Sequence, residues 1–529
     1  MVVTKSSGRN VILGVDIGTT NIKCFAYNSS MEVIAKAKAV LPVCNLKNGG
    51  QEIVPDELWK NFKNVVKQCL LSSKLSSSDV LSLGISTQRG TFVTWDSLFM
   101  FFIRNSGETF HNFITWKDKR AKSVCELWNA SPCIKFLRLG AFIMYIFTRM
   151  KKFQLLSRLQ FSTAMVLIRL YWIFQNTIQL QNKESHKNVL FGTIETWLVW
   201  KLTEKQVHTT DASNACATGF FDPFRMKWAK WLLNIFGIPT MILPTVLNTC
   251  DSFGEASEEI FGFPIPIHAL VGDQQASLFG AGCFKKYDMT CTMGTGSFLT
   301  MNTGNSPFGA YSGIGFYPLV GWTISSETTY IIEGGVHDVG TVLSWASNIG
   351  LVDIPENSDK IALNVPDNGN VYFLPGANVS KHSKGEAFSS SFTGIATHTS
   401  KEHLVRSILE ALSFQVCELY KIVQSKYEIC RDSLFCVAGG VAKNDFIVQL
   451  ASNVTERKIS RLNNTESSSC GAALLAGLYS GVWKNQDEIK QLVTKSTIFS
   501  PDSNLKLRAK EEFATWKNSY SHSIINRQV

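Results

Sequence analysis

The stretch from Val11 to Tyr27, VILGVDIGTTNIKCFAY, decides the expected fold. Two apolar runs flank a turn of small residues that begins at Gly18, a pattern typical of a β-hairpin. Glycine lets the backbone approach a ligand closely, and free N–H groups in such a turn can surround phosphate oxygens. Asp16 stands beside the turn, where a carboxylate can hold Mg²⁺ through water. Taken alone, the hairpin is equally compatible with an ordinary pair of strands.

A second stretch repeats this layout roughly 280 residues later. Met289 to Thr300, MTCTMGTGSFLT, again places a turn of glycine and hydroxyl residues between two apolar runs. Two such hairpins predict a duplicated lobe, with each copy offering its hairpin to a shared cleft. The pair resembles the two phosphate-binding hairpins of the sugar kinase, actin and heat-shock ATPase superfamily. That resemblance implies an α/β fold of two ribonuclease H-like lobes of the actin and hexokinase type around a central cleft.

The length and composition agree with two folded lobes. A chain of 529 residues can bury two large cores, and 45% hydrophobic with 18% charged residues is typical of a globular protein. We expect the boundary near Pro266, with an N-terminal lobe at 10–266 and a C-terminal lobe at 267–520. The net charge of +10 is modest for this length, and no RNA-binding motif or zinc-finger spacing accompanies it. The sequence therefore argues against nucleic acid as a partner.

The cysteines and the N-terminal residues indicate the compartment. The 13 cysteines form no CxxC pair, which is typical of reduced thiols in a cytoplasmic protein. The first ten residues, MVVTKSSGRN, lack the apolar segment of a signal peptide, and no run reaches the roughly 18 apolar residues of a membrane span. We expect a soluble cytoplasmic protein with no transmembrane segment, and the sequence leaves a homodimer open.

One region has an unusual charge pattern. Residues 127–183 contain no Asp or Glu, while lysines and arginines stand among many aromatic and leucine residues. The favoured interpretation is a set of amphipathic helices with basic outer faces. The alternative is a helix that binds a membrane surface or an acidic partner.

Two chemically important residues follow predicted strands. Arg89 comes after an apolar strand at Leu81–Ser86, and Asp273 comes after a strand at 264–272. In α/β folds the carboxyl ends of strands carry ligand contacts. Asp273 could therefore accept a proton from an attacking hydroxyl, although a lone Asp at a strand end is more often a helix cap. Its place just before the second hairpin favours the catalytic role.

Other segments have helical spacing. We expect helices at Asp56–Leu71, at 192–202, at Glu333–Trp345 and at His403–Gln424. The first of these helices places its apolar residues, Leu58, Phe62, Val65, Val66 and Cys69, on one face.

The motifs, in their order along the chain, resemble the FGGY carbohydrate kinases and, within them, the glycerol kinases. The likeness covers nearly the whole chain and rests on these segments: GVDIGTT, ISTQRG, ITWKDKRA, FGTIETWLVWKLT, GDQQASLFG, MGTGSFLTMNTG and AGGVAKNDF. It implies an ATP-dependent kinase that phosphorylates glycerol or a similar small polyol to its 3-phosphate, with ATP and Mg²⁺ as cofactors.

The resemblance also implies roles for individual residues. Asp273 would be the general base, and Asp16 would coordinate Mg²⁺ through water. The residues around the ATP phosphates would be Gly18, Thr19, Thr20, Lys23, Gly294, Thr295 and Gly296. Those around the adenosine and ribose would be Gly340, Gly440 and Asn444. The polyol would lie among Arg89, Trp116, Asp273, Gln274 and Phe298.

This sequence departs from the family pattern at several positions. Glycerol kinases have Glu after the Gln-Arg pair, where this chain has Gly90. The loss of such a carboxylate, worth on the order of 1.5–3 kcal/mol, would weaken polyol binding about tenfold to a hundredfold. Lys23 stands where the family has an arginine, and it keeps the positive charge but not the planar guanidinium that can form two parallel hydrogen bonds. An apolar insert stands at Leu98–Ile103, and a Trp-Asp-Pro loop is missing between 375 and 388.

These departures favour two alternatives to a glycerol kinase. The first is a nucleotide-binding regulatory protein that has lost efficient polyol chemistry. The second is a kinase of a different sugar, because Gly90 opens room for a bulkier substrate.

Overall fold

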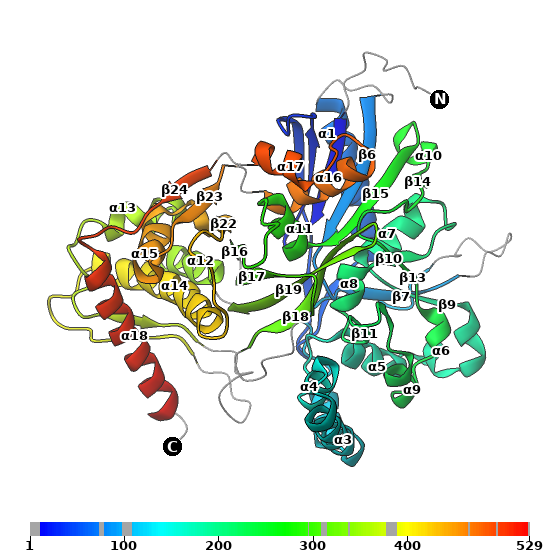
Figure 1. Ribbon diagram of the computed structural model, residues 1–529, viewed down its shortest axis with the longest axis horizontal. Helices are drawn as coiled ribbons and strands as arrows, with labels where there is room; N and C mark the ends of the chain where they lie inside the picture. The colour runs from blue at the N-terminus through cyan, green and yellow to red at the C-terminus, as the bar shows by residue number, and fades with distance from the viewer. Residues whose placement is uncertain are drawn as a thin grey trace.

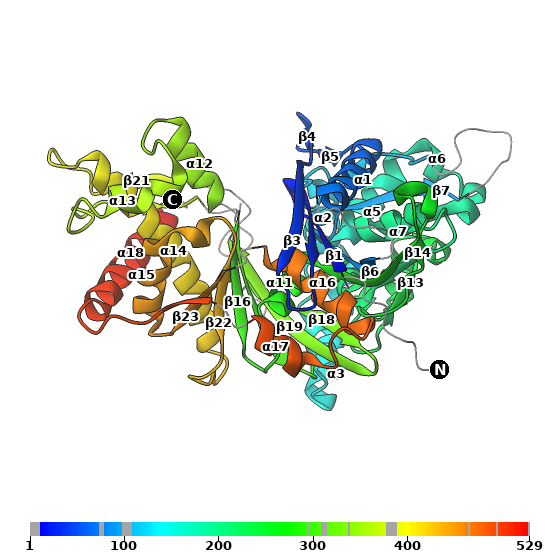
Figure 2. The ribbon, with the colours of Figure 1, turned by 90° about the horizontal axis from the view of Figure 1, so that it is seen from above.

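The computed structural model describes residues 11–72, 79–97, 108–294, 296–307, 315–336, 339–376, 389–463, 466–493 and 496–526. It has two α/β lobes, with the N-terminal strands in one and most of the C-terminal strands in the other (Figures 1 and 2). The apolar insert at 98–103, residues 377–388 of the shortened loop, and Thr295 lie outside the described residues. The expectations about them stay predictions.

The first sheet contains the predicted N-terminal hairpin. Strands β1 and β2 pair antiparallel, with Asp16 opposite Lys23, and β6 and β15 extend the sheet in parallel on the other side of β1. The spatial order is β14 (Glu255–Ala256), β15 (Ile265–Gly272), β6 (Val80–Thr87), β1 (Val11–Ile17), β2 (Asn21–Tyr27) and β3 (Val33–Val40). The hairpin is confirmed.

The second sheet repeats this arrangement. Strands β16 and β17 form the second predicted hairpin, and β22 and β23 run parallel to β16 on its other side. The spatial order is β18 (Tyr317–Ile324), β19 (Glu327–Val336), β17 (Ser297–Gly304), β16 (Met289–Met293), β22 (Phe435–Ala438), β23 (Ile459–Leu462) and β24 (Ser496–Phe499). The duplicated lobe predicted from the two hairpins is therefore present.

Most of the predicted helices are found within a few residues of their expected ends. Helix α1 (Pro55–Ser72) buries its apolar face against the first sheet, and α14 (Lys401–Gln424) lies in the core of the second lobe. Helix α7 begins at Ile194 and ends at Leu202, because the two residues before it complete strand β9 (Val189–Thr193).

The helix predicted from Glu333 to Trp345 was wrong in its first part. Glu333 lies in strand β19, and helix α12 covers only Gly340–Asn348. The two glycines after Glu333 explain the difference. Side chains at Gly334 and Gly335 would press on Phe316 and Phe298, and β19 pairs with β17 and β18 on its two sides. Long-range strand pairing therefore overrides the local helical spacing.

Two helices that pack on each other connect the lobes. Helix α11 (Asp273–Gly280) packs on α16 (Ser467–Tyr479), and α16 also covers the first sheet although it comes from the end of the chain. The approach is very close, because a Cβ on Gly84 would lie 2.0 Å from the carbonyl oxygen of Ala472. The boundary expected at residue 266 remains a proposal; β15, which crosses it, pairs with β6 of the first sheet.

The acid-free region, residues 127–183, contains the end of helix α2 (Lys122–Ala130) and four further helices, which are α3 (Pro132–Thr148), α4 (Lys151–Ser157), α5 (Val166–Asn176) and α6 (Ile178–Gln181). Helix α5 is buried, whereas α3 and α4 project from the body (Figure 1). The outer face of α3 is apolar and not basic, which corrects the favoured interpretation for this helix. Among the helices of the described ranges, none is by itself long and apolar enough to cross a membrane, and only the pair α2 and α3, bent by 58°, reaches that length and composition together.

Candidate active site

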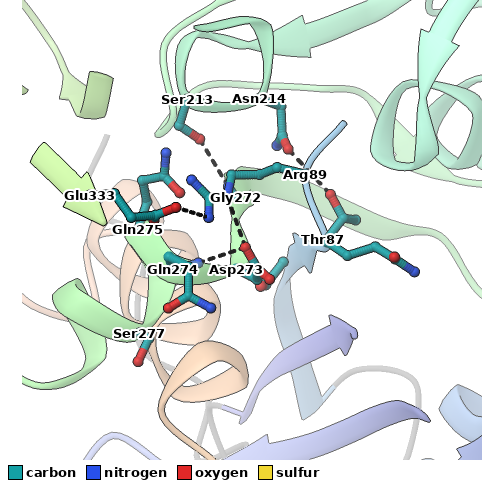
Figure 3. A network of polar contacts seen from close by, with 12 residues as sticks. Thr87, Arg89, Ser213, Asn214, Gly272, Asp273, Gln274, Gln275, Ser277 and Glu333 are labelled. Carbon is teal, nitrogen blue, oxygen red and sulfur yellow. Dashed lines mark hydrogen bonds and ion pairs between the residues drawn. The ribbon is translucent and has the colours of Figure 1, made fainter. Parts of the chain in front are cut away.

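Arg89 and Asp273 meet at one edge of the first sheet. Strands β6 and β15 are parallel neighbours, with Gly272 opposite Thr87, so the residues that follow them emerge side by side. The Arg89 Nε donates to Asp273 Oδ1 at 2.9 Å, and the backbone N–H of Gln274 donates to the same oxygen at 2.8 Å (Figure 3). The two residues singled out at predicted strand ends therefore form one ion pair.

A second carboxylate, from the other sheet, completes this group. Arg89 Nη2 donates to Glu333 Oε1 at 2.8 Å, and Figure 3 shows Arg89 between Asp273 and Glu333. Glu333 is fully buried, and Tyr317 donates its hydroxyl to the same Oε1 at 2.5 Å. Neither Glu333 nor Tyr317 was predicted as a site residue. The only local signal was a single acidic residue inside the apolar run YIIEGGV.

Burial and charge together determine how these groups ionise. Burial raises the pKa of Asp273, Arg89 opposes that shift, and the charge of Glu333 adds to it. Burial acts to lower the pKa of Arg89, but the charges of Glu333 and Asp273 outweigh it and keep the guanidinium charged. Burial also raises the pKa of Tyr317, so its hydroxyl stays a donor. Asp273 is thus a carboxylate whose proton affinity is increased, held in place by a permanent cation.

The first hairpin presents a turn with room beside it. The N–H of Gly18 donates to Asn21 O at 3.0 Å, and a Cβ on Gly18 would meet nothing closer than 3.5 Å. Thr19 is half-buried and Thr20 is exposed. Asp16, at the end of β1, accepts a hydrogen bond from Ser86 at 3.0 Å. This turn can therefore be approached by a ligand on its backbone side.

Lys23 is already engaged within the protein. It lies opposite Asp16 in the hairpin, and its Nζ forms an ion pair with the Glu466 carboxylate just before α16. Burial raises the pKa of Asp16 to about 7, and Lys23 acts against that shift while Glu466 adds to it. Two carboxylates and one lysine therefore share this corner, and the Glu466 carboxylate competes with any phosphate for Lys23.

The second hairpin brings together three of the predicted nucleotide residues. The N–H of Gly294 donates to Gly296 O at 2.8 Å, and the N–H of Gly340 donates to Gly294 O at 3.0 Å. A Cβ on Gly440 would meet no atom within 4 Å. Asn444 differs, because its side chain caps helix α15 (Asp445–Thr455) through the N–H of Ile447 at 3.1 Å. Its amide nitrogen also donates to a serine hydroxyl at 3.0 Å.

Trp116 connects the two hairpins. Its indole N–H donates to Thr19 Oγ1 at 3.4 Å, and its ring meets the ring of Phe298 edge-on, with centroids 6.3 Å apart. Thr19 belongs to the first turn and Phe298 to strand β17 of the second hairpin. The two turns therefore face one another through a single aromatic side chain.

The side-chain oxygen of Gln274 is an unused hydrogen-bond acceptor among the described residues. Its side chain is buried beside Asp273, and its Oε1 has no hydrogen-bond partner within the described parts of the chain. A buried acceptor without a donor is costly, so this oxygen is suited to receive a hydrogen bond from a ligand hydroxyl.

Gly90 stands in a backbone conformation that disfavours a side chain. Its φ is +71°, and a Cβ would lie 3.4 Å from Nη2 of the buried Arg169. Arg169 donates to Gly90 O at 2.8 Å and to Thr115 O at 2.6 Å, and burial lowers its pKa to about 9. Gly90 and Thr115, which precedes Trp116, are thus both held by hydrogen bonds from Arg169.

The residues present fit a hydrated Mg²⁺ ion. Asp16 is a half-buried carboxylate whose raised pKa reflects burial that Lys23 only partly offsets, and a cation would offset more of it. The described ranges contain no cluster of three or more His, Cys, Asp or Glu side chains that could hold a metal ion. Mg²⁺ keeps several waters and shares phosphate oxygens, so one carboxylate beside the turn is sufficient.

Comparisons with known proteins identify the family of the chain. Residues 11–280 match the N-terminal domain of the FGGY family of carbohydrate kinases, and residues 289–479 match its C-terminal domain. The chain is 38% identical to glycerol kinase 5 of Bos taurus, over 93% of this chain and 91% of that protein. It is 30% identical to glycerol kinase 2 of Thermotoga maritima, over 97% of this chain and 98% of that protein.

A solved structure extends the likeness to three dimensions. Plasmodium falciparum glycerol kinase with ADP superimposes with a TM-score of 0.82 at 27% identity, covering 99% of both chains. Sequence and fold therefore lead to the same assignment. The chain belongs to the FGGY family of carbohydrate kinases.

Proposed function

We propose that this carbohydrate kinase transfers the γ-phosphoryl group of ATP to a primary hydroxyl of glycerol or a similar small polyol, giving the 3-phosphate. The names of its relatives support a glycerol kinase, and the Plasmodium falciparum structure contains ADP. The observation that carries the proposal is the ion pair of Arg89 with Asp273, beside the unpartnered acceptor of Gln274. This arrangement combines a base with a hydrogen-bond acceptor for a hydroxylated substrate.

Asp273 is the general base of the proposed reaction. Its raised proton affinity brings it closer to the working pH, where a base transfers protons efficiently. The polyol oxygen forms a bond to the γ-phosphorus, the bond from that phosphorus to the bridging oxygen breaks, and ADP leaves. The hydroxyl proton passes to Asp273. Arg89 fixes the orientation of the carboxylate during this step.

The two hairpins hold the phosphates in this proposal. The turns that contain Gly18 and Gly294 contact the triphosphate from opposite sides, together with Thr19, Thr20, Thr295 and Gly296. Lys23 adds a positive charge once it leaves Glu466. Gly340, Gly440 and Asn444 border the adenosine and ribose, and Trp116 and Phe298 border the polyol. Residues 10–266 and 267–520 are the corresponding lobes.

Asp16 holds the magnesium ion through water in this proposal. When bound, Mg²⁺ neutralises the charge that develops on the β- and γ-phosphate oxygens. The protein groups around Asp16 prepare its position: Ser86 orients one carboxylate oxygen, and Lys23 lies opposite in the hairpin.

The test is ADP release in the presence of glycerol, a panel of polyols and a panel of ketoses. We expect release with glycerol or a related polyol, and a fall in kcat of about 10²- to 10⁴-fold in Asp273→Asn. Asp432→Asn, at an exposed aspartate far from this group in the sequence, is the control and should match wild type. Retained stabilisation by ADP would show that Asp273→Asn is folded.

Other outcomes would support the alternatives. Turnover confined to a ketose or larger sugar would assign a different substrate. Nucleotide binding without turnover on any member of the panels would support a regulatory protein. An Asp273→Asn variant as active as wild type would remove Asp273 from the role of base.

A further inference from the structure

The helical hairpin of α3 and α4, residues 132–157, has a surface that the kinase chemistry does not use. Figure 1 shows both helices extending from the body. Only two of the 17 residues of α3, Ile134 and Ala141, are buried, and α4 has no buried residue. Most of α3 therefore has no partner among the described residues that would cover it.

The exposed face of α3 is strongly apolar. The large apolar side chains that are exposed on α3 are Phe136, Leu139, Phe142, Ile143, Met144, Ile146 and Phe147. The positions 136, 139, 143 and 146 are spaced by three, four and three residues, so they share one side of the helix. Phe136 and Phe147, near the two ends, are 73% and 81% exposed. A continuous apolar face of this kind marks an interaction surface.

The charges within the α3–α4 hairpin itself are all of one sign. From residue 127 to residue 183 the chain has no acidic residue. Lys135 and Arg149 lie near the two ends of α3 and are exposed, and Lys151 and Lys152 begin α4. Helices that lie in the interface of an anionic bilayer have this composition, with Phe, Leu and Ile on one face and Lys and Arg beside them. Each basic residue near such a surface adds to the attraction.

We propose that the α3–α4 hairpin binds the surface of membranes that contain anionic phospholipids. The apolar face of α3 enters the boundary between headgroups and acyl chains, and the lysines and arginines contact lipid phosphates. The mode is binding at the surface, because α3, with 17 residues, is not by itself long and apolar enough to cross a membrane, and the pair that it forms with α2 is bent by 58°. A second copy of this chain fits less well, since it would bring two sets of positive charges together.

The experiment is cosedimentation of the full chain with unilamellar vesicles. We expect binding to phosphatidylcholine vesicles with roughly one-quarter phosphatidylserine, weakened by added salt, and little binding to pure phosphatidylcholine. Phe147→Glu should reduce the bound fraction about tenfold, and Lys135→Glu should reduce it several-fold. Leu71→Glu, at a leucine 78% exposed on α1, is the matched control and should bind as wild type does.

Several results would overturn the proposal. One is absence of binding to phosphatidylserine vesicles, and another is equal binding to neutral vesicles. Equal loss in Leu71→Glu would show that α3 is not the element responsible. Sedimentation velocity should show the same oligomeric state for wild type and Phe147→Glu. A dimer that Phe147→Glu dissociates would assign the face to a second copy. Kinase activity with soluble substrates should be unchanged in Phe147→Glu, which separates this surface from the proposed reaction.

Discussion

The guanidinium of Arg89 binds the carboxylate of Asp273 at 2.9 Å, across the ends of two neighbouring parallel strands. The same guanidinium binds Glu333 of the second sheet at 2.8 Å. One cation is therefore shared between the proposed base and a fully buried carboxylate. Removal of the Glu333 charge is therefore expected to alter both the position and the proton affinity of Asp273.

Glu333→Gln is expected to shift the pH profile. The charge of Glu333 raises the pKa of Asp273, so its removal lowers that pKa. Because the base must be ionised, the acid limb of kcat should move to lower pH, and kcat itself should fall about tenfold as the base weakens and Arg89 loses an anchor. Rates measured from pH 5 to pH 9 would check this.

Two variants sharpen this test. Glu333→Asp keeps the charge and should recover most of the wild-type profile. Tyr317→Phe removes the hydroxyl that donates to Glu333 but leaves the carboxylate, so the acid limb should stay close to wild type. An unchanged acid limb in Glu333→Gln would show that Glu333 has only a structural role.

The sequence was sufficient to predict the parts of this site that depend on local pattern. The two hairpins have short-range signals, and Arg89 and Asp273 each follow an apolar strand. Parallel pairing of those strands then brings the two residues together without further information. The pairing of equivalent strands in both lobes made the fold predictable for the same reason.

Glu333 and the exposed face of α3 were not predictable in this way. Glu333 reaches Arg89 across 244 positions of sequence, and its strand is specified by neighbours on both sides. The sequence predicted amphipathic helices with basic outer faces for residues 127–183, but which face of α3 is covered depends on tertiary contacts. Likewise, the sequence shows at Gly90 only the loss of the family's glutamate. The hydrogen bond from Arg169 to the Gly90 carbonyl oxygen is visible only in the structure.

Gly90→Ala should be destabilising and should also affect the substrate. Its φ of +71° costs an L-residue about 1–2 kcal/mol, and the added Cβ would contact Arg169 Nη2 at 3.4 Å. Arg169 also holds the carbonyl oxygen of Thr115, next to Trp116, so the KM for the polyol should rise. Denaturant unfolding and steady-state kinetics would measure the two effects.

Gly237→Ala separates strain from contact. Gly237 has a similar φ of +66°, but a Cβ there would meet no atom within 4 Å. Gly237→Ala should lose only the stability that the positive φ costs an L-residue, and it should keep the wild-type KM for the polyol. Equal losses of stability in both variants, with no change in KM, would contradict the role assigned to Arg169.

His111 should make the fold sensitive to acid. Burial lowers the pKa of His111 to about 4, below its ordinary value of 6.5. Its Nδ1 donates to Asn112 O at 2.6 Å, and its Nε2 accepts from the hydroxyl of Thr94 at 2.9 Å, which fits a neutral ring. The unfolded chain binds the proton more readily, so stability is lost as the pH falls from 6.5 to 4, by up to about 3 kcal/mol.

Urea unfolding at pH 4.5 and pH 7 would measure this loss. His111→Gln should be less stable than wild type at pH 7, because it loses the ring contacts, but its stability should change less between the two pH values. His398→Gln, at an exposed histidine, should keep the wild-type dependence. A His111→Gln variant with the full wild-type dependence would assign the acid sensitivity to other groups.

Glu466→Gln should strengthen ATP binding, because Lys23 would no longer be paired with a carboxylate in the absence of nucleotide. Both side chains are partly exposed, so the ion pair is worth about 0.2–1 kcal/mol, and the KM for ATP should fall about two- to fivefold. Glu418→Gln breaks a comparable pair between α14 and Lys517 of helix α18 (Lys506–Asn526), and should leave that KM unchanged. If the KM instead rises in Glu466→Gln, Glu466 holds Lys23 in its working position, and the exchange of partners proposed for Lys23 does not occur.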